Sequence, residues 1–200
     1  MSVAGVVSLG ARRGLTSPRN WRQSVLAELS IPLKEIDVVN KESFLEILKE
    51  HPFTKDLSPE HQAKLAELAH ETRFEREQII FHESDASQFF YLILKGKVAL
   101  EVMAPGRALR IQTLTDGEEF SWSSLLPSTR KFFQARALTS VRALVFDAAQ
   151  LRASCDQDCS FGYAFISRLL AVVAGRLQAT RLRLLDMYGV QERTTHEGDD

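Results

Sequence analysis

Cysteine, histidine and serine are the residue types through which this chain would most readily bind metals or act as a nucleophile. It has two cysteines, Cys155 and Cys159, which are too few for a disulfide scaffold or a four-cysteine zinc site. The five histidines form no H-x3-H or H-E-x-x-H pattern, so no metal site is predicted. No nucleophile elbow, Ser–His–Asp order or carboxylate pair stands out either. We therefore expect a protein that is not an enzyme and that has no metal or bound cofactor.

The composition predicts a globular chain with one buried core. Of its 200 residues, 44% are hydrophobic, and 12 Phe supply ample material for that core. The formal net charge of −1 gives no overall field that would attract nucleic acid or an anionic membrane. The chain has no run of about 18 apolar residues, so we expect no membrane span. The cysteines are interpreted as incidental thiols of a reduced, cytoplasmic protein.

The two ends of the chain differ in composition from its middle. Residues 1–40 are interpreted as a flexible or loosely helical arm, and no acid precedes Glu28 in this basic segment. A basic transit peptide is the alternative interpretation of the same segment. Residues 190–200 are charged and Thr-rich, which predicts a disordered tail. The domain is therefore expected within 41–189.

The hydrophobic pattern of the middle changes from helical to strand-like and back. Helical spacing predicts one helix over 41–49 and a second from Ser58-Pro59 to about Glu71, with Ser58 as its N-cap. Short apolar segments separated by turns then run from Arg73 to Phe146, with a positive φ expected at Gly96. The pattern of residues 160–188 predicts one long helix, which is expected to end at Gly189.

Four stretches, in this order and at these separations, resemble the cyclic nucleotide-binding domain family. The resemblance covers about two thirds of the chain and includes HPFTKDLSPEHQAKLAE, IIFHESDASQFFYLILKGKVAL, LTDGEEFSWSSLLPSTRKFFQARALTSVRAL and GRLQATRLRLL. They are similar to the leading helices, the paired strands, the phosphate-binding cassette and the dimer helix of the bacterial transcription-regulator branch. The resemblance implies an α+β fold: an antiparallel β-roll of the double-stranded jelly-roll type, flanked by N-terminal helices and a long C-terminal dimerisation helix.

The cassette is the part of the resemblance in which the residues differ most. The family pattern is F-G-E-x-A-L followed by P-R-A-A/T, in which Glu accepts a ribose hydroxyl and Arg binds the phosphate. In this chain Ser121 replaces the Gly, Trp122 the Glu and Lys131 the Arg, with Arg130 at the position of the Pro. Ser84 likewise replaces a turn Gly. Indole offers only a donor, and lysine is a point charge rather than a planar fork, so the ligand chemistry is expected to differ.

Two interpretations of this cassette remain open. In the first, it binds a cyclic nucleotide or another small anion, with Arg130 supplying a guanidinium if its side chain turns inward. In the second, Trp122, Phe132 and Phe133 plug the pocket and no ligand binds. The candidate ligand-binding residues are Ser121, Trp122, Ser123, Ser124, Arg130, Lys131, Phe132 and Phe133, joined by Thr180 from the C-terminal helix.

The C-terminal helix carries an a/d heptad, the pattern of a coiled-coil seam. The seam consists of Ile166, Leu170, Val173, Leu177, Thr180, Leu184 and Met187. Phe165, Leu169, Val172 and Leu185 offer a second apolar face that suits packing on the roll. We therefore expect a homodimer formed through parallel helices. Thr180 either sets the register of the seam or, as the resemblance implies, reaches the ligand.

The expected function is that of a stand-alone regulatory or sensor domain. A ligand would move the cassette against the helix and shift a dimer equilibrium. No DNA-binding output domain is expected, because only residues 190–200 follow the helix. Direct DNA binding and a membrane partner are accordingly not expected. The alternative is a ligand-free homodimeric scaffold that recruits a partner protein.

Overall fold

The computed structural model of this chain describes residues 41–126 and 130–194, without the side chains of Lys41 and of 187–194. The predicted arm at 1–40 and the last residues of the predicted tail lie outside these described residues. Helix α2 (Lys41–Glu50) comes first, and α3 (Pro59–Leu68) follows it. The hydroxyl of Ser58 accepts the backbone N–H of His61, which confirms the predicted N-cap.

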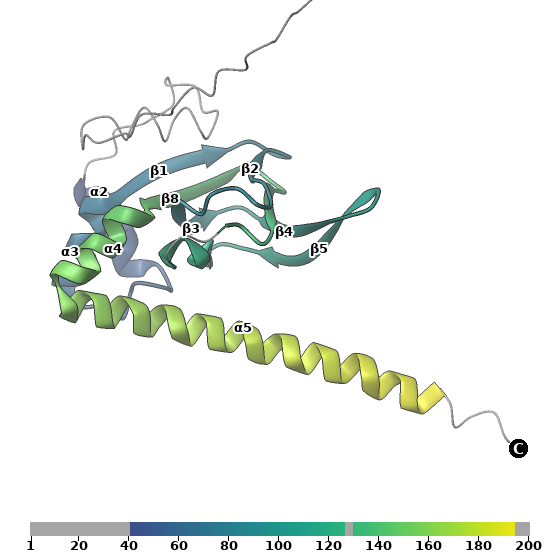
Figure 1. Cartoon of the computed structure of the whole chain (residues 1–200). Helices are drawn as coiled ribbons and strands as arrows, with labels where there is room; N and C mark the ends of the chain where they lie inside the picture. The colour runs from purple at the N-terminus through teal and green to yellow at the C-terminus, as the bar shows by residue number, and fades with distance from the viewer. Residues whose placement is uncertain (1–40, 127–129, 195–200) are drawn as a thin grey trace, which may run out of the picture. The chain divides into compact units, whose positions relative to one another are not determined.

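The strands form two antiparallel sheets, which confirms the β-roll fold (Figure 1). The sheet orders are β1-β8-β3-β6 and β2-β7-β4-β5. Gly96, in the turn between β3 and β4, has a φ of 108°, as predicted. The strands are β1 (Ala69–Phe74), β2 (Ile79–Phe81), β3 (Phe89–Lys95), β4 (Val98–Ala104), β5 (Arg107–Leu114), β6 (Glu119–Phe120), β7 (Gln134–Ala137) and β8 (Val141–Asp147).

The helices and the first sheet share an apolar core. Helices α2, α3 and α4 (Ala148–Gln157) gather at one end of the sheets (Figure 1). Phe90 of β3 and Phe146 of β8 are fully buried, and α5 (Cys159–Thr194) adds the fully buried Phe161 and the nearly buried Phe165 to the same cluster. The rings of Phe90 and Phe165 meet edge to face at 5.7 Å. The long helix is thus anchored in the core at its N-terminal end.

Two predicted helix ends were wrong. Helix α3 ends at Leu68 rather than near Glu71, because Ala69–Phe74 pairs with β8 residue by residue. Helix α5 continues past Gly189 to Thr194, so the first residues of the predicted tail are helical. A glycine inside a helix lowers its stability by only about 1 kcal/mol relative to alanine. Glycine alone is therefore a weak signal for the end of a helix.

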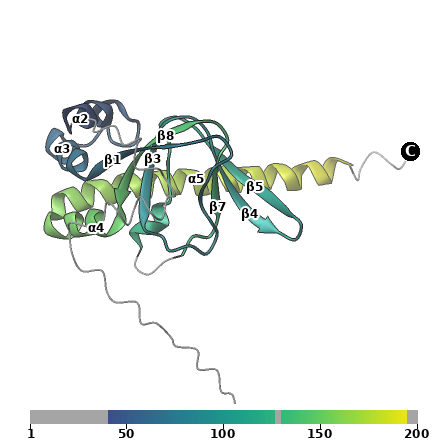
Figure 2. The same cartoon turned by 90° about the horizontal axis from the view of Figure 1, so that it is seen from above.

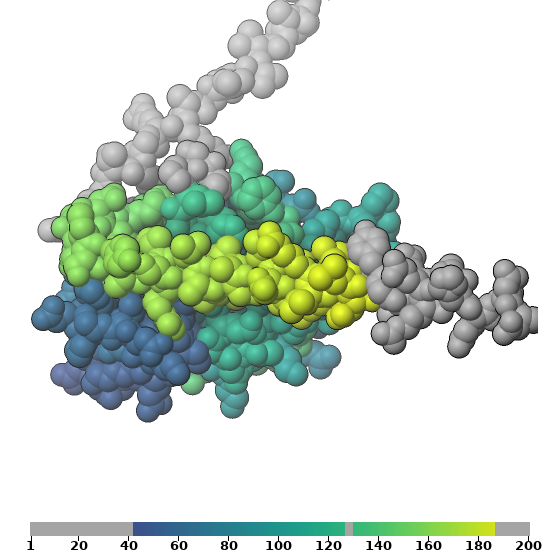
Figure 3. Space-filling model, turned by 90° about the horizontal axis from the view of Figure 1, so that it is seen from below, coloured from purple at the N-terminus to yellow at the C-terminus, as the bar shows by residue number. Residues whose placement is uncertain are grey.

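Helix α5 runs along the surface of the domain (Figure 3), and its C-terminal part projects beyond the sheets (Figure 2). By length and hydropathy alone, Cys159–Asp186 would qualify as a membrane-crossing helix. Within that stretch, however, Arg168 and Arg176 donate to backbone carbonyl groups of the domain, and Phe161 is buried in its core. These contacts assign the helix to the domain, and the expectation of no membrane partner stays a prediction.

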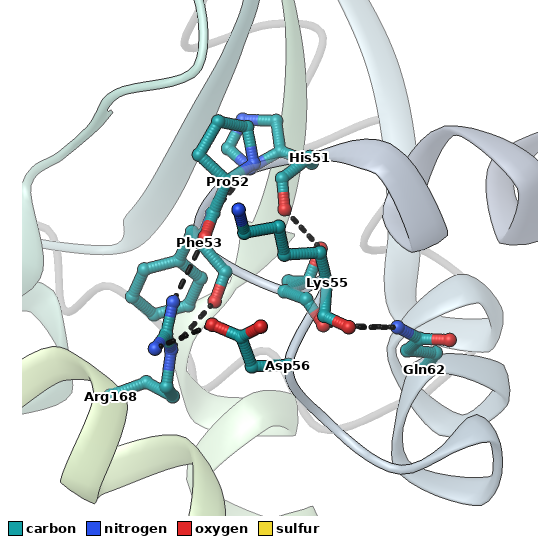
Figure 4. A network of polar contacts seen from close by, with 8 residues as sticks. His51, Pro52, Phe53, Lys55, Asp56, Gln62 and Arg168 are labelled. Carbon is teal, nitrogen blue, oxygen red and sulfur yellow. Dashed lines mark hydrogen bonds and ion pairs between the residues drawn. The ribbon is translucent and has the colours of Figure 1, made fainter.

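The turn after α2 connects α5 to the N-terminal helices (Figure 4). Arg168 donates to the carbonyl oxygens of Pro52 at 2.9 Å and Phe53 at 3.3 Å, and its Nη1 pairs with Asp56 at 2.9 Å. The ring of His51 accepts the Phe53 N–H at Nδ1, while Nε2 lies 3.3 Å from the carbonyl oxygen of Ile93. This arrangement requires neutral His51 with the proton on Nε2. Burial lowers the pKa of His51 accordingly.

Candidate functional site

The segment between β6 and β7 corresponds to the predicted cassette. A short 3-10 helix, η2 (Trp122–Leu125), follows Ser121, whose φ of 66° lies in the left-handed region. The Ser121 hydroxyl donates to the carbonyl oxygen of Phe89 on β3 at 2.5 Å, which holds this backbone in place. Ser84, the other serine at an expected glycine position, has a φ of 69°. Both positions therefore keep a conformation that glycine adopts most easily.

Lys131 is the cation of this segment that lies between the two sheets. The residue is only 5% exposed, its Nζ lies 4.3 Å from the centroid of the Phe81 ring, and it donates to the Ser121 hydroxyl. Its backbone N–H donates to the carbonyl of Asp85, and its carbonyl accepts the N–H of Ser84. Burial lowers the pKa of Lys131 to about 7, although the charge of Asp85 opposes this change.

Three aromatic rings surround this part of the roll interior. Tyr91 of β3 and Phe120 of β6 stack at 4.5 Å with an interplanar angle of 8°. The Phe81 ring of β2 lies 6.2 Å from Tyr91 and 6.1 Å from Phe120. Such apolar surroundings favour the neutral form of an amine and strengthen its attraction to any anion that enters.

The structure gives three other predicted site residues a different orientation. Arg130 is exposed, and its Nη1 donates outward to the carbonyl oxygen of Ser84 at 2.9 Å, so it does not turn a guanidinium inward. Phe132 is 65% exposed and Phe133 is 37% exposed. Their exposure does not fit the second interpretation, in which this pair fills the roll interior.

The side chains of η2 face two surroundings. Trp122 is partly buried and packs against the apolar core that the helices share with β3 and β8. This packing gives its indole a structural role. Ser123 shares a hydrogen bond of 3.1 Å with the hydroxyl of Ser87. Ser124 is fully buried, and its hydroxyl has no hydrogen-bond partner among the described residues. The carbonyl of Ser124 accepts from Arg152 of α4 at 2.5 Å.

Helix α5 contacts β6, directly before the cassette, through an arginine that the sequence analysis did not single out. Arg176 Nη2 donates to the Glu119 carbonyl at 2.7 Å and pairs with Oε1 of its carboxylate at 2.5 Å. Burial raises the pKa of Glu119, and the charge of Arg176 opposes that rise. Thr180 is exposed and donates to the Arg176 carbonyl of its own helix at 2.9 Å. Within one chain, then, Arg176 rather than Thr180 contacts the strand that leads into the cassette.

Two signals could have revealed this contact. An arginine flanking an apolar seam needs a partner when it faces the domain, and Glu118-Glu119 is an acidic pair directly before the cassette. Neither signal, however, predicts which residue is the partner. No group of three His, Cys, Asp or Glu residues suitable for a metal ion occurs in 41–126 and 130–194.

Comparison with known proteins agrees with this geometry. Residues 71–158 match the family model described as "Cyclic nucleotide-binding domain". The N-terminal domain of a transcriptional regulator from Streptomyces coelicolor A3(2) is 25% identical, with a TM-score of 0.55 over 69% of this chain and 94% of that one. A cyclic nucleotide-binding domain from Methylobacillus flagellatus KT is 20% identical, with a TM-score of 0.63 over 74% of this chain and 83% of that one.

The same fold occurs in the Catabolite Activator Protein of Thermus thermophilus. It is 24% identical, with a TM-score of 0.57 over 68% of this chain and 63% of that one. The comparison with curated proteins found no match. The two sheets, the cassette between β6 and β7 and the matched stretch together identify residues 71–158 as a domain of the cyclic nucleotide-binding family.

Proposed function

We propose that this protein is a regulatory sensor module whose cassette binds a small anion, a cyclic nucleotide or another phosphate or carboxylate. The observation that carries the proposal is Lys131, a nearly buried cation between the sheets that no described carboxylate contacts. A charge buried in this way is costly unless an opposite charge or strong acceptor joins it. Its role is regulatory rather than catalytic, in keeping with its family.

Two hydroxyl groups of the cassette, one in contact with Lys131 and one without a partner among the described residues, support an anion site in this segment. The Ser121 hydroxyl already accepts from the lysine, and the buried Ser124 hydroxyl lacks a partner among the described residues. Buried polar groups are normally satisfied by protein, water or ligand. Because Trp122 provides no acceptor for a ribose hydroxyl, the oxyanion part of a ligand would supply most of the recognition.

A thermal-shift screen tests this proposal. Cyclic AMP, cyclic GMP, a cyclic dinucleotide, sulfate and small carboxylates are compared on wild type, on Lys131→Met and on the matched control Arg130→Ala. A ligand at 100 times its Kd adds about 2.7 kcal/mol to the free energy of unfolding. We expect a concentration-dependent rise in melting temperature that Arg130→Ala keeps and Lys131→Met loses. A response that Lys131→Met retains in full would contradict the assignment of Lys131.

The second candidate function is a ligand-free scaffold that recruits a partner protein. The stacked Tyr91 and Phe120 favour it, because they and Phe81 already occupy part of the roll interior. This candidate predicts no thermal shift with any member of the screen.

We also propose that two copies pair through α5. The predicted seam is exposed on the single chain: Ile166 by 47%, Leu170 by 66% and Leu177 by 50%. Leu184 continues it at 48%, whereas Met187 lies beyond the described side chains. Exposed apolar residues at a/d spacing are what a parallel coiled coil buries. A cytoplasmic location is part of the same proposal.

Sedimentation velocity tests the pairing. Leu177→Glu introduces a charge at the centre of the seam and is expected to give monomers. Leu182→Glu is the matched control, since Leu182 is 56% exposed on the same helix but lies outside the heptad positions. If wild type sediments as a monomer, or if both variants dissociate equally, the seam is not the interface.

A further inference from the structure

The cation in this cassette is a lysine enclosed by apolar groups. We propose that the cassette takes up its anion together with a proton, so that the site reports anion concentration and pH jointly. The inference rests on the proposed anion-binding function. It concerns Lys131, the position at which the family pattern has an arginine, which stays charged at any physiological pH.

The surroundings of the Lys131 amine favour its neutral form. Its Nζ faces the ring of Phe81 at 4.3 Å and the hydroxyl of Ser121, and the residue is 5% exposed. A ring face and one hydroxyl replace only part of the hydration that an ammonium loses on burial. Tyr91 and Phe120 extend the apolar wall behind Phe81.

The charged groups on the neighbouring elements are engaged elsewhere. Asp85 attracts the amine from the turn after β2, but its carboxylate accepts the backbone N–H of His82 at 2.7 Å. Glu101 of β4 accepts from Arg136 at 3.1 Å and from Gln134 at 3.1 Å. The remaining engaged groups are His82 with Gln134, Glu119 with Arg176, and Arg130 with the Ser84 carbonyl. An entering anion would therefore be the first close counter-charge of Lys131 among the described residues.

Proton uptake follows from the difference between the free and the occupied site. In the free protein, burial holds the pKa of Lys131 at about 7, so about half of the molecules are uncharged at neutral pH. A bound anion raises that pKa, because an opposite charge favours the ammonium form. Binding above neutral pH must therefore recruit a proton, and the affinity falls as the pH rises.

The first test measures affinity against pH with two probes, sulfate and cyclic AMP. Neither probe changes its charge between about pH 6 and about pH 9, so any dependence belongs to the protein. With a free-site pKa of about 7, binding is expected to be roughly 50-fold weaker at pH 9 than at pH 7. In Lys131→Arg the cation cannot lose its proton, and the dependence is expected to shrink to less than about twofold.

The outcomes separate this inference from the function on which it rests. Binding with the same affinity at both pH values would overturn proton uptake and leave the anion site standing. Absence of binding by both probes at every pH, together with no thermal shift in the full ligand screen, would overturn the proposed function, and the inference with it. A wild-type dependence that Lys131→Arg retains unchanged would assign the titration to another group and overturn the role of Lys131.

A second measurement does not depend on any ligand or on how well the variant folds. In wild-type protein with 13C-labelled lysine, the Cε signal of Lys131 is followed from about pH 6 to about pH 11. A transition near neutral pH, far below those of the exposed lysines, supports the inference. A transition together with the exposed lysines, near pH 10, would refute it.

Discussion

The contact between Arg176 of α5 and Glu119 of β6 is the basis of the most sharply testable prediction about stability. The Glu119 side chain is 4% exposed and that of Arg176 is 20% exposed, with 2.5 Å between Nη2 and Oε1. The same guanidinium satisfies the Glu119 carbonyl at 2.7 Å. Arg176→Met keeps most of the volume of the side chain but leaves a buried carboxylate without its ion-pair partner and a carbonyl without its donor.

The magnitude follows from the cost of an unpaired buried charge. Removing one partner of a buried ion pair typically costs about 3–5 kcal/mol. Because a fifth of the Arg176 side chain reaches solvent, we place the loss at the lower end, about 3 kcal/mol at neutral pH. That loss corresponds to a factor of roughly 150 in the folding equilibrium.

The pH dependence of this loss distinguishes charge from packing. Burial already raises the pKa of Glu119, and without Arg176 it rises further. A carboxyl group with a raised folded-state pKa destabilises the protein above that pKa and ceases to do so below its unfolded value. The cost of Arg176→Met should therefore decrease as the pH falls from about 7 towards about 4.5.

Urea unfolding followed by circular dichroism measures both effects. Arg181→Met is the matched control, an exposed arginine on the same helix that should cost less than about 0.5 kcal/mol. Glu119→Gln combined with Arg176→Met should recover much of the stability, because the amide needs no cation. A loss below about 1 kcal/mol in Arg176→Met, or one that does not decrease on acidification, would refute this account of the contact.

Three further predictions concern buried groups and a turn. Neutral His51 contributes stability that is present above its unfolded pKa of about 6.5 and is lost as the pH falls through its lowered folded pKa. In urea titrations, the free energy of unfolding of His51→Gln should therefore fall less on acidification than that of wild type. Lys131→Met should raise the free energy of unfolding at pH 7 by roughly 1–4 kcal/mol, a gain that vanishes as the pH approaches about 10.5. In thermal melts, Gly96→Ala should destabilise more than Gly106→Ala: both have positive φ, but a Cβ at Gly96 would lie 2.4 Å from the Ser140 carbonyl oxygen, whereas at Gly106 nothing lies within 4 Å. Equal melting temperatures in the two glycine variants would contradict the steric explanation.

Elements whose signals are local could be predicted from the sequence. The prediction failed where a partner distant in the chain determines the conformation. Ser58 and the glycine turn at Gly96 act within a few residues, and the structure confirms both. Residues 69–71 continue a helical pattern, yet they begin β1 because β8 pairs with every residue of Ala69–Phe74. Helix α4 was missed because its apolar face is narrow and its burial is supplied by α5 and the sheet. Propensity is a weak guide wherever tertiary contacts supply more free energy.

At the cassette, sequence reasoning selected the segment between β6 and β7 but did not predict the direction of all its side chains. Arg130 and Lys131 are adjacent and both cationic, and a one-residue change in register would exchange their roles. Backbone hydrogen bonds of Lys131 with Ser84 and Asp85 fix the register. In this register the Lys131 side chain lies between the sheets and that of Arg130 points outward. These partners lie more than 40 residues away in the chain, so no local pattern contains them.

The two serines at glycine positions show why likeness of fold does not settle the ligand. Ser84 and Ser121 keep the positive φ of the turn and of the cassette, so the backbone retains its course although the residues changed. The same exchange brings a hydroxyl to Lys131, where glycine would offer none. A scaffold can thus be conserved in shape while its donors and charges change, and the fold then constrains where a ligand binds more than which ligand it is. At the proposed anion site, a titratable amine and a hydroxyl would select the ligand, so affinity measured against pH is the test that bears on its identity.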